Sequence, residues 1–168
     1  DGIVEIIVHD NISQRPELGH KICRAFELKE VIIAPSSSSR DRTAWNIGER
    51  VALFLDRILK DESVLGVGRG RACYYTGRNI KNSRNVHVDV VQLLGTASST
   101  ATMEEGGSLI SLFASKLNGT GYVLNAPLMV RSKRTKQDLL GSALLENTAK
   151  RYNSLDAAVF EISQPDLY

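Results

Sequence analysis

Short apolar runs alternate with longer amphipathic segments along the whole chain. The runs are rich in β-branched residues, a pattern that predicts strands. The predicted strands are residues 2–10, 29–35, 63–68, 85–95, 120–127 and 155–162. Two of these runs, "KEVIIAP" (29–35) and "SVLGVG" (63–68), show no polar alternation, which is typical of strands buried on both faces of a sheet.

The segments between these runs carry apolar residues at helical spacing. The predicted helices are residues 13–28, 43–60, 69–80, 103–119 and 132–153. Ser132 fits an N-cap, and Asn118-Gly119 fits a C-terminal stop signal. Strands that alternate with helices form βαβ units. The sequence therefore predicts one α/β domain over residues 1–168, with a Rossmann-like, mostly parallel sheet and helices on both faces.

Charge and composition narrow the class of protein. The 168 residues carry a net charge of +2, well below the basic balance of a stand-alone nucleic-acid-binding domain. No apolar run reaches the roughly 20 residues that span a bilayer, and the N-terminus has no signal-peptide pattern, so we expect a cytoplasmic protein without a membrane partner. Cys23 and Cys73 are expected to be free thiols. The three histidines lack metal-ligand spacing, and we expect neither a metal nor a cofactor.

Four polar segments follow predicted strands or lie beside them. They are Ser36–Arg42, Gly68–Ala72, Gly95–Thr100 and Pro127–Ser132. Ligands of open α/β sheets bind beyond the carboxyl ends of the strands, where these segments are expected to gather. All four are rich in glycine, serine, threonine or arginine, which offer backbone N–H groups, hydroxyls and guanidinium groups to a phosphate or a polyol.

The stretch "VLGVGRGRACYYTG" (64–77) is the most specific of these signals. It matches a dinucleotide fingerprint poorly, because Arg71 stands where the third small residue is needed. A phosphate cradle fits better: Gly68 and Gly70 permit close approach, and Arg69 or Arg71 supplies charge at a helix N-terminus. The alternative is a tight turn with solvated arginines, and the spacing alone leaves both open. Arg131 begins a second basic run, which is either an anion site or a solvated face.

Four motifs occur in one order along the chain: "ELKEVIIAP" (27–35), "GVGRGRAC" (66–73), "VVQLLGTAS" (90–98) and "VLNAPLMVRS" (123–132). Together they resemble the C-terminal, sugar-sensing domain of SorC-type bacterial transcriptional regulators. The resemblance implies a fold of the glucosamine-6-phosphate deaminase and ribose-5-phosphate isomerase superfamily, reused as a sensor rather than an enzyme.

In that family a sugar or sugar-phosphate effector alters a homo-oligomer, a dimer or tetramer, and thereby its operator affinity. DNA is bound by an N-terminal helix-turn-helix domain, which we expect to be absent from this chain. The last residues, "AAVFEISQPDLY", stand about where the family reads D-x-A-L-V-G-I-G and continues through further strands. The resemblance therefore implies a sensor domain that is incomplete at its C-terminal end.

The resemblance also implies the effector-binding residues. The family's phosphate-contacting turn falls on Gly70, Arg71 and Ala72, its "Q-L-x-G" element supplies Gln92 and Gly95, and a polar position after "A-P" falls on Arg131. With the neighbouring turn residues, the predicted effector-binding set is Gly68, Arg69, Gly70, Arg71, Ala72, Gln92, Gly95 and Arg131. Two departures disfavour an anion: Ala72 replaces a threonine, and Glu104 and Glu105 stand where the family often has an amide.

Two other functions fit the same sequence. A sugar-phosphate isomerase or deaminase would need an acid/base pair in the loops, where Asp41, Glu104 and Glu105 are the nearby carboxylates. A ligand-free oligomerisation module is the third possibility, since the threonine is replaced and the C-terminus is short.

Overall fold

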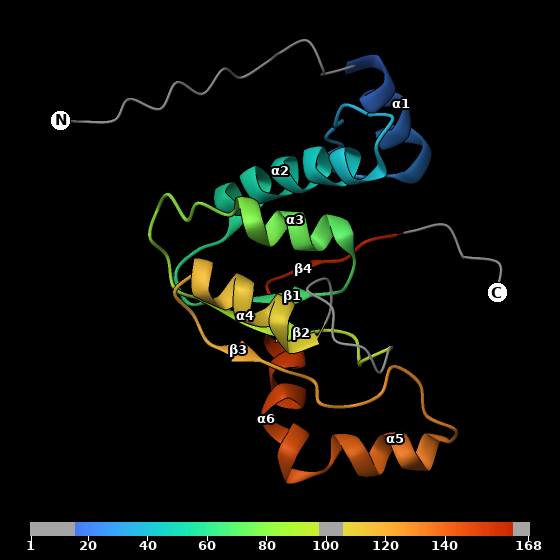
Figure 1. Ribbon diagram of the computed structural model, residues 1–168, viewed down its shortest axis with the longest axis vertical. Coiled ribbons are helices and arrows are strands. Elements are labelled where there is room, and N and C mark those ends of the chain that lie inside the picture. The colour runs from blue at the N-terminus through green and yellow to red at the C-terminus, as the bar shows by residue number, and fades with distance from the viewer. Residues whose placement is uncertain (1–15, 98–105, 163–168) are drawn as a thin grey trace.

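A parallel sheet forms the centre of the molecule in the computed structural model, which describes residues 16–97 and 106–162 (Figure 1). Within these ranges the strands are β1 (Ser63–Val67), β2 (Val88–Gln92), β3 (Gly121–Tyr122) and β4 (Ala157–Val159). They lie in the order β3-β2-β1-β4, and every neighbouring pair is parallel. The predicted α/β class with a mostly parallel sheet is therefore confirmed.

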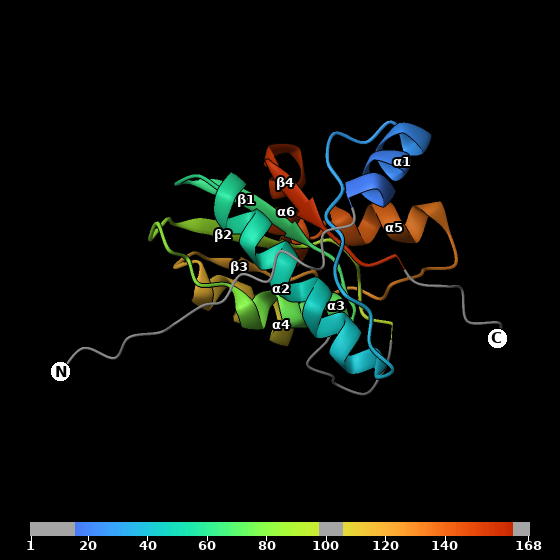
Figure 2. The same ribbon diagram turned by 90° about the horizontal axis from the view of Figure 1, so that it is seen from above.

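Helices cover both faces of this sheet. The helices of the described residues are α1 (Pro16–Phe26), α2 (Arg40–Ile58), α3 (Arg71–Asn79), α4 (Gly106–Lys116), α5 (Lys133–Leu140) and α6 (Ala143–Arg151), with a 3-10 turn, η2, at Tyr152–Ser154. Figure 2 shows α2, α3 and α4 on one side of the sheet and α6 on the other. This layered arrangement is the one that alternating strands and helices predict.

The main core lies between the sheet and α2, α3 and α4. Every residue of β1 is buried, as predicted for a strand covered on both faces. Among the described residues, Phe113 of α4 is the largest side chain that is fully buried, and it packs against α3 at Gly77. A side chain at Gly77 would place its Cβ 2.8 Å from the Phe113 ring, so the glycine lets the two helices approach.

The predicted strand at 29–35 is wrong. These residues form no strand in the structure, and Ile32 is 44% exposed. The segment runs beside α2, where the Asn46 side chain donates a hydrogen bond to the Pro35 carbonyl at 2.9 Å. Short apolar runs have no periodicity that separates a paired strand from an extended segment packed on a helix. The edge strand that pairs with β1 is β4, and residues 29–35 do not join the sheet.

The predicted helix at 132–153 is two helices, α5 and α6, that meet at Gly141 and Ser142. Ser142 takes an extended conformation, with ψ of 146°, and its hydroxyl donates to the Leu139 carbonyl at 2.6 Å. Serine competes with helical hydrogen bonding in this way, and the chain turns at that point. The other helices and strands are confirmed with shifted or shorter bounds, and the predicted N-cap at Ser132 is correct. The predicted strand at 2–10 lies outside the described residues.

Candidate functional site

The turn between β1 and α3 packs closely against the end of β4. Gly68 donates its N–H to the Val159 carbonyl at 2.8 Å, and a Cβ on Gly68 would lie 2.7 Å from the Phe160 Cβ. Gly70, the N-cap of α3, has a φ of +122°, which favours glycine. A Cβ on Gly70 would lie 2.3 Å from Glu161 Oε2. Both glycines are therefore explained by contact with the residues that follow β4.

A carboxylate of the protein itself, that of Glu161, is bound at the N-terminus of α3. The backbone N–H of Ala72 donates a hydrogen bond to Glu161 Oε2 at 2.8 Å. Free N–H groups and the aligned peptide dipoles make a helix N-terminus favourable for a negative charge. The sequence left open whether this turn is an anion cradle or only a tight turn, and in the structure the Glu161 carboxylate lies against it.

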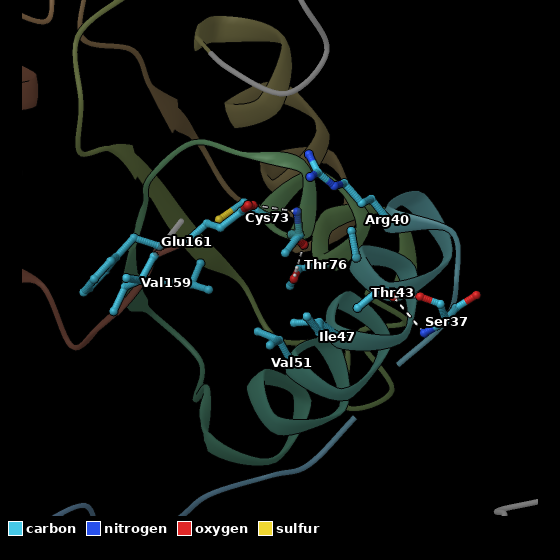
Figure 3. A pocket seen from close by; sticks show the side chains of 13 residues that line it. Ser37, Arg40, Thr43, Ile47, Val51, Cys73, Thr76, Val159 and Glu161 are labelled. Atoms are coloured by element: carbon cyan, nitrogen blue, oxygen red, sulfur yellow. Dashed lines mark hydrogen bonds between the residues drawn. The ribbon is translucent and has the colours of Figure 1, made fainter. Parts of the chain in front are cut away.

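A cavity of about 400 Å³ opens beside this turn, between the start of α2, the first turns of α3 and the end of β4. Its polar lining residues are Ser37, Arg40, Thr43, Thr76 and Glu161, and its larger apolar lining residues are Ile47, Val51, Val159, Phe160 and Ile162. Figure 3 shows Arg40 reaching from α2 toward the start of α3, which Glu161 approaches from the β4 side. The volume lies in the range of small-molecule sites.

The polar groups of the cavity differ in what they can offer a ligand. Thr76 donates to the Ala72 carbonyl at 2.8 Å, and Thr43 holds the backbone of Ser37 through hydrogen bonds of 2.9 and 3.2 Å. These hydroxyls therefore shape the site. Arg40 has no ion-pair or hydrogen-bond partner within the part of the chain that the structure describes. Its guanidinium and the Glu161 carboxylate are the charged groups that line the cavity.

Arg71, the predicted clamp, is exposed and contacts Asp41. Its Nη1 is 3.5 Å from Asp41 Oδ1, and Arg71 is not among the residues that line the cavity. The other oxygen of Asp41 accepts a hydrogen bond from the Tyr75 hydroxyl at 2.6 Å, which raises the pKa of Tyr75 above its usual value. The structure thus gives Arg71 a contact that joins α2 to α3. Arg69 is exposed and does not line the cavity.

Gln92 and Gly95 bring the loops after β2 and β3 together. Gln92 is 3% exposed, its Nε2 donates to the Leu94 carbonyl at 2.6 Å, and its Oε1 accepts the Leu124 N–H at 3.0 Å. A Cβ on Gly95 would lie 2.5 Å from the carbonyl oxygens of Ala126 and Pro127. In the structure these two residues connect loops, and neither lines the cavity.

Arg131 lies away from the cavity. It is exposed and comes directly before Ser132, the N-cap of α5. Figure 1 shows α5 at the end of the molecule opposite to α2. The side chains from 131 to 138 are all exposed to solvent. Residues 98–100, Glu104 and Glu105 lie outside the described residues.

Sequence reasoning missed Arg40 and Glu161 as site residues. Arg40 lies in the predicted segment Ser36–Arg42, in which only Asp41 is identified from the sequence, as a carboxylate for the enzymatic alternative. Glu161 was counted inside the predicted strand at 155–162, whereas β4 ends at Val159. The rule that ligands bind beyond the carboxyl ends of strands identifies Glu161 once the true end of the strand is known.

Cys73 borders the cavity and is 2% exposed. Burial raises the pKa of its thiol to about 11, and the nearby Glu161 charge adds to the shift. Because the thiolate is the reactive form, we expect iodoacetamide at pH 8 to modify Cys73 about a hundredfold or more slowly than the half-buried Cys23. Mass spectrometry of the labelled peptides measures both rates. Equal rates in the folded chain would contradict the burial of Cys73, and urea-unfolded protein is the control.

The described residues give no sign of a metal centre or a membrane span. Within residues 16–97 and 106–162, no three His, Cys, Asp or Glu side chains are grouped so that they could hold a metal ion. None of the helices in these ranges is long and apolar enough to cross a bilayer.

Comparisons with known proteins agree with the fold and with the sequence motifs. The family model described as "Putative sugar-binding domain" matches residues 10–166. The sorbitol operon regulator of Klebsiella pneumoniae is 22% identical over 98% of this chain and 53% of its own length, and an uncharacterised transcriptional regulator of Escherichia coli K12, YjhU, is 26% identical over 88% and 46%. The chain thus spans about half the length of these curated relatives.

Solved structures show the same fold. The full-length Klebsiella sorbitol operon regulator, SorC, superposes with a TM-score of 0.79 and covers 92% of this chain and 51% of its own. A transcriptional regulator from Streptococcus pneumoniae, 20% identical, superposes with a TM-score of 0.68 over 84% and 55%. These relatives are transcriptional regulators rather than enzymes. The chain belongs to the sugar-binding domain family of SorC-type transcriptional regulators.

Proposed function

We propose that the cavity between α2, α3 and the end of β4 binds the effector of a transcriptional regulator, a sugar or sugar phosphate. The observation that carries this proposal is that Arg40 and Glu161 line the same cavity as the apolar side chains of Ile47 and Val51. Sugar hydroxyls donate hydrogen bonds to a carboxylate and accept them from a guanidinium group, while the C–H faces of the ring pack on apolar side chains.

The charged residues of the cavity come from two different elements, α2 and the segment after β4, so one ligand could contact both. Arg40 lies at the start of α2, and Glu161 follows β4. A sugar that contacts both side chains would favour one arrangement of α2 relative to the sheet. In a homo-oligomer, dimer or tetramer, such a preference changes operator affinity through a coupling free energy of typically about 1–3 kcal/mol. The DNA would be bound by a separate domain of the regulator, in the bacterial cytoplasm.

The enzymatic alternative has weak support. An isomerase or deaminase needs a general acid and a general base near the substrate. Among the described residues that line the cavity, Glu161 is the only carboxylate, and its Oε2 is bound to the Ala72 N–H. The ligand-free oligomerisation module is the remaining alternative, which a binding measurement separates from the proposal.

Calorimetric titration of the 168-residue chain with a panel of hexoses, pentoses, hexitols and their phosphate esters tests this proposal. We expect at least one member to bind with a dissociation constant below about 1 mM, which corresponds to a binding free energy of about −4 kcal/mol. Turnover of glucosamine 6-phosphate or ribose 5-phosphate would instead support the enzyme. A folded, oligomeric chain that binds no member would support the ligand-free module.

A further inference from the structure

The Glu161 carboxylate occupies the position at which an anionic ligand would contact the β1–α3 turn. Its Oε2 accepts the Ala72 N–H at 2.8 Å and lies so near Gly70 that a Cβ there would be 2.3 Å away. A phosphate group that used the same backbone N–H would have to displace this oxygen. One of the free N–H groups at the N-terminus of α3, that of Ala72, is thus already bound by a charged group of the chain itself.

The charges of the cavity lead to the same conclusion. Arg40 is the cation and Glu161 the anion among its described lining residues, so the lining carries no net charge. A phosphate dianion would gain the attraction of Arg40 but would meet the like charge of Glu161 at close range. A neutral sugar meets no such repulsion, because its hydroxyls donate to the carboxylate. Oε1 of Glu161 has no hydrogen-bond donor among the described residues, so it can accept one.

We infer that Glu161 is a specificity-determining residue, which makes this site select an uncharged sugar or polyol over its phosphate ester. The inference rests on the proposed function and narrows its ligand class. Arg40 then serves as a hydrogen-bond donor to hydroxyl oxygens. The apolar floor, with Ile47 and Val51, contacts the C–H face of the ring.

Inorganic phosphate is the probe for this inference, since it carries the charge of the ester without the sugar. The variant Glu161→Gln keeps the side-chain shape and an oxygen that can accept the Ala72 N–H, but it removes the charge. We expect its affinity for inorganic phosphate to exceed that of the wild-type chain about tenfold or more, a difference of about 1.4 kcal/mol. Glu161→Ala is the second variant, and it also removes the side chain from the Ala72 N–H. Its affinity for inorganic phosphate should rise at least as much.

The matched control is Glu146→Gln, which makes the same change in net charge on α6, where Glu146 pairs with Lys150 at 2.7 Å. It should bind phosphate like the wild type. Phosphate affinity is measured by titration of the Ala72 amide signal in the NMR spectrum of each ¹⁵N-labelled chain. Equal affinity of the wild-type and Glu161→Gln chains would overturn the inference, as would an equal gain in Glu146→Gln.

The sugar panel separates this inference from the proposed function. If sugar phosphates bind the wild-type chain more tightly than the corresponding neutral sugars, the effector proposal stands and the role of Glu161 is refuted. If no sugar binds while Glu161→Gln gains phosphate affinity, the exclusion of phosphate by Glu161 stands and the effector proposal fails.

Discussion

Replacing Phe113 with alanine is expected to lower the free energy of unfolding by about 3–5 kcal/mol. The ring is 0% exposed and packs between α3 and the sheet, where it contacts the α3 backbone at Gly77. Truncation removes buried apolar surface and leaves a cavity that the surrounding helices can fill only in part. Because a domain of this size is stable by about 5–15 kcal/mol, this single change removes a large share of the total.

Phe26→Ala is the matched control, because the same side chain is 71% exposed there, in the last turn of α1. It should change the free energy of unfolding by less than about 0.5 kcal/mol. Urea unfolding, followed by far-UV circular dichroism, measures both variants. If the two phenylalanine variants lost the same stability, the core between α4 and the sheet would be misplaced.

Arg40→Ala is expected to weaken binding of the effector about tenfold to a hundredfold. Hydrogen bonds to a charged group contribute about 1.5–3 kcal/mol each, and Arg40 lines the cavity without a partner in the described chain. The side chain is exposed at the start of α2, so its loss should leave the stability of the fold nearly unchanged. Calorimetric titration with the tightest-binding sugar of the panel gives the ratio of affinities.

Arg131→Ala provides the matched control for this prediction. Arg131 was the basic residue that the family resemblance placed at the site, but it lies before α5 and does not line the cavity. Its replacement should leave the affinity unchanged. If Arg131→Ala lost affinity and Arg40→Ala did not, the binding site would lie at the loops after β2 and β3 instead.

The sequence predicted most of the fold because its strongest signals are local. The glycine-bounded apolar run of β1, the helical periodicity of α2 and the cap at Ser132 each depend on neighbouring residues alone. The segment at 29–35 depends instead on whether a neighbouring strand is present to pair with it. No local pattern carries that information, and the apolar run therefore predicted a strand that the structure does not contain.

The candidate cavity involves two of the predicted segments, but of the predicted effector-binding residues only Ala72 lines it. Two of the four selected segments, Ser36–Arg42 and Gly68–Ala72, contribute to one cavity. Within them the sequence could not show which arginine faces inward, because that depends on the partner each one meets. Arg71 lies 3.5 Å from Asp41 and does not line the cavity, whereas Arg40, the residue before Asp41, does.

Close contacts between neighbouring segments explain the three predicted glycines, Gly68, Gly70 and Gly95. Gly68 and Gly70 permit the approach of β4 and Glu161, and Gly95 permits the approach of the loop at 126–127. Glycines that allow a ligand to approach and glycines that allow another loop to approach have the same sequence pattern. A single sequence therefore shows that the backbone is closely approached, but not whether a ligand or another loop approaches it.

The most direct test of the account is to map the bound effector on the amide NMR spectrum of the 168-residue chain. We predict that the tightest-binding sugar of the panel shifts the signals of Thr43, Ala72 and Thr76, which border the cavity, and leaves those of Gly95 and Arg131 in place. Shifts confined to Gly95 and the loop at 126–128, or no shift with any sugar, would contradict the assignment of the effector site to this cavity.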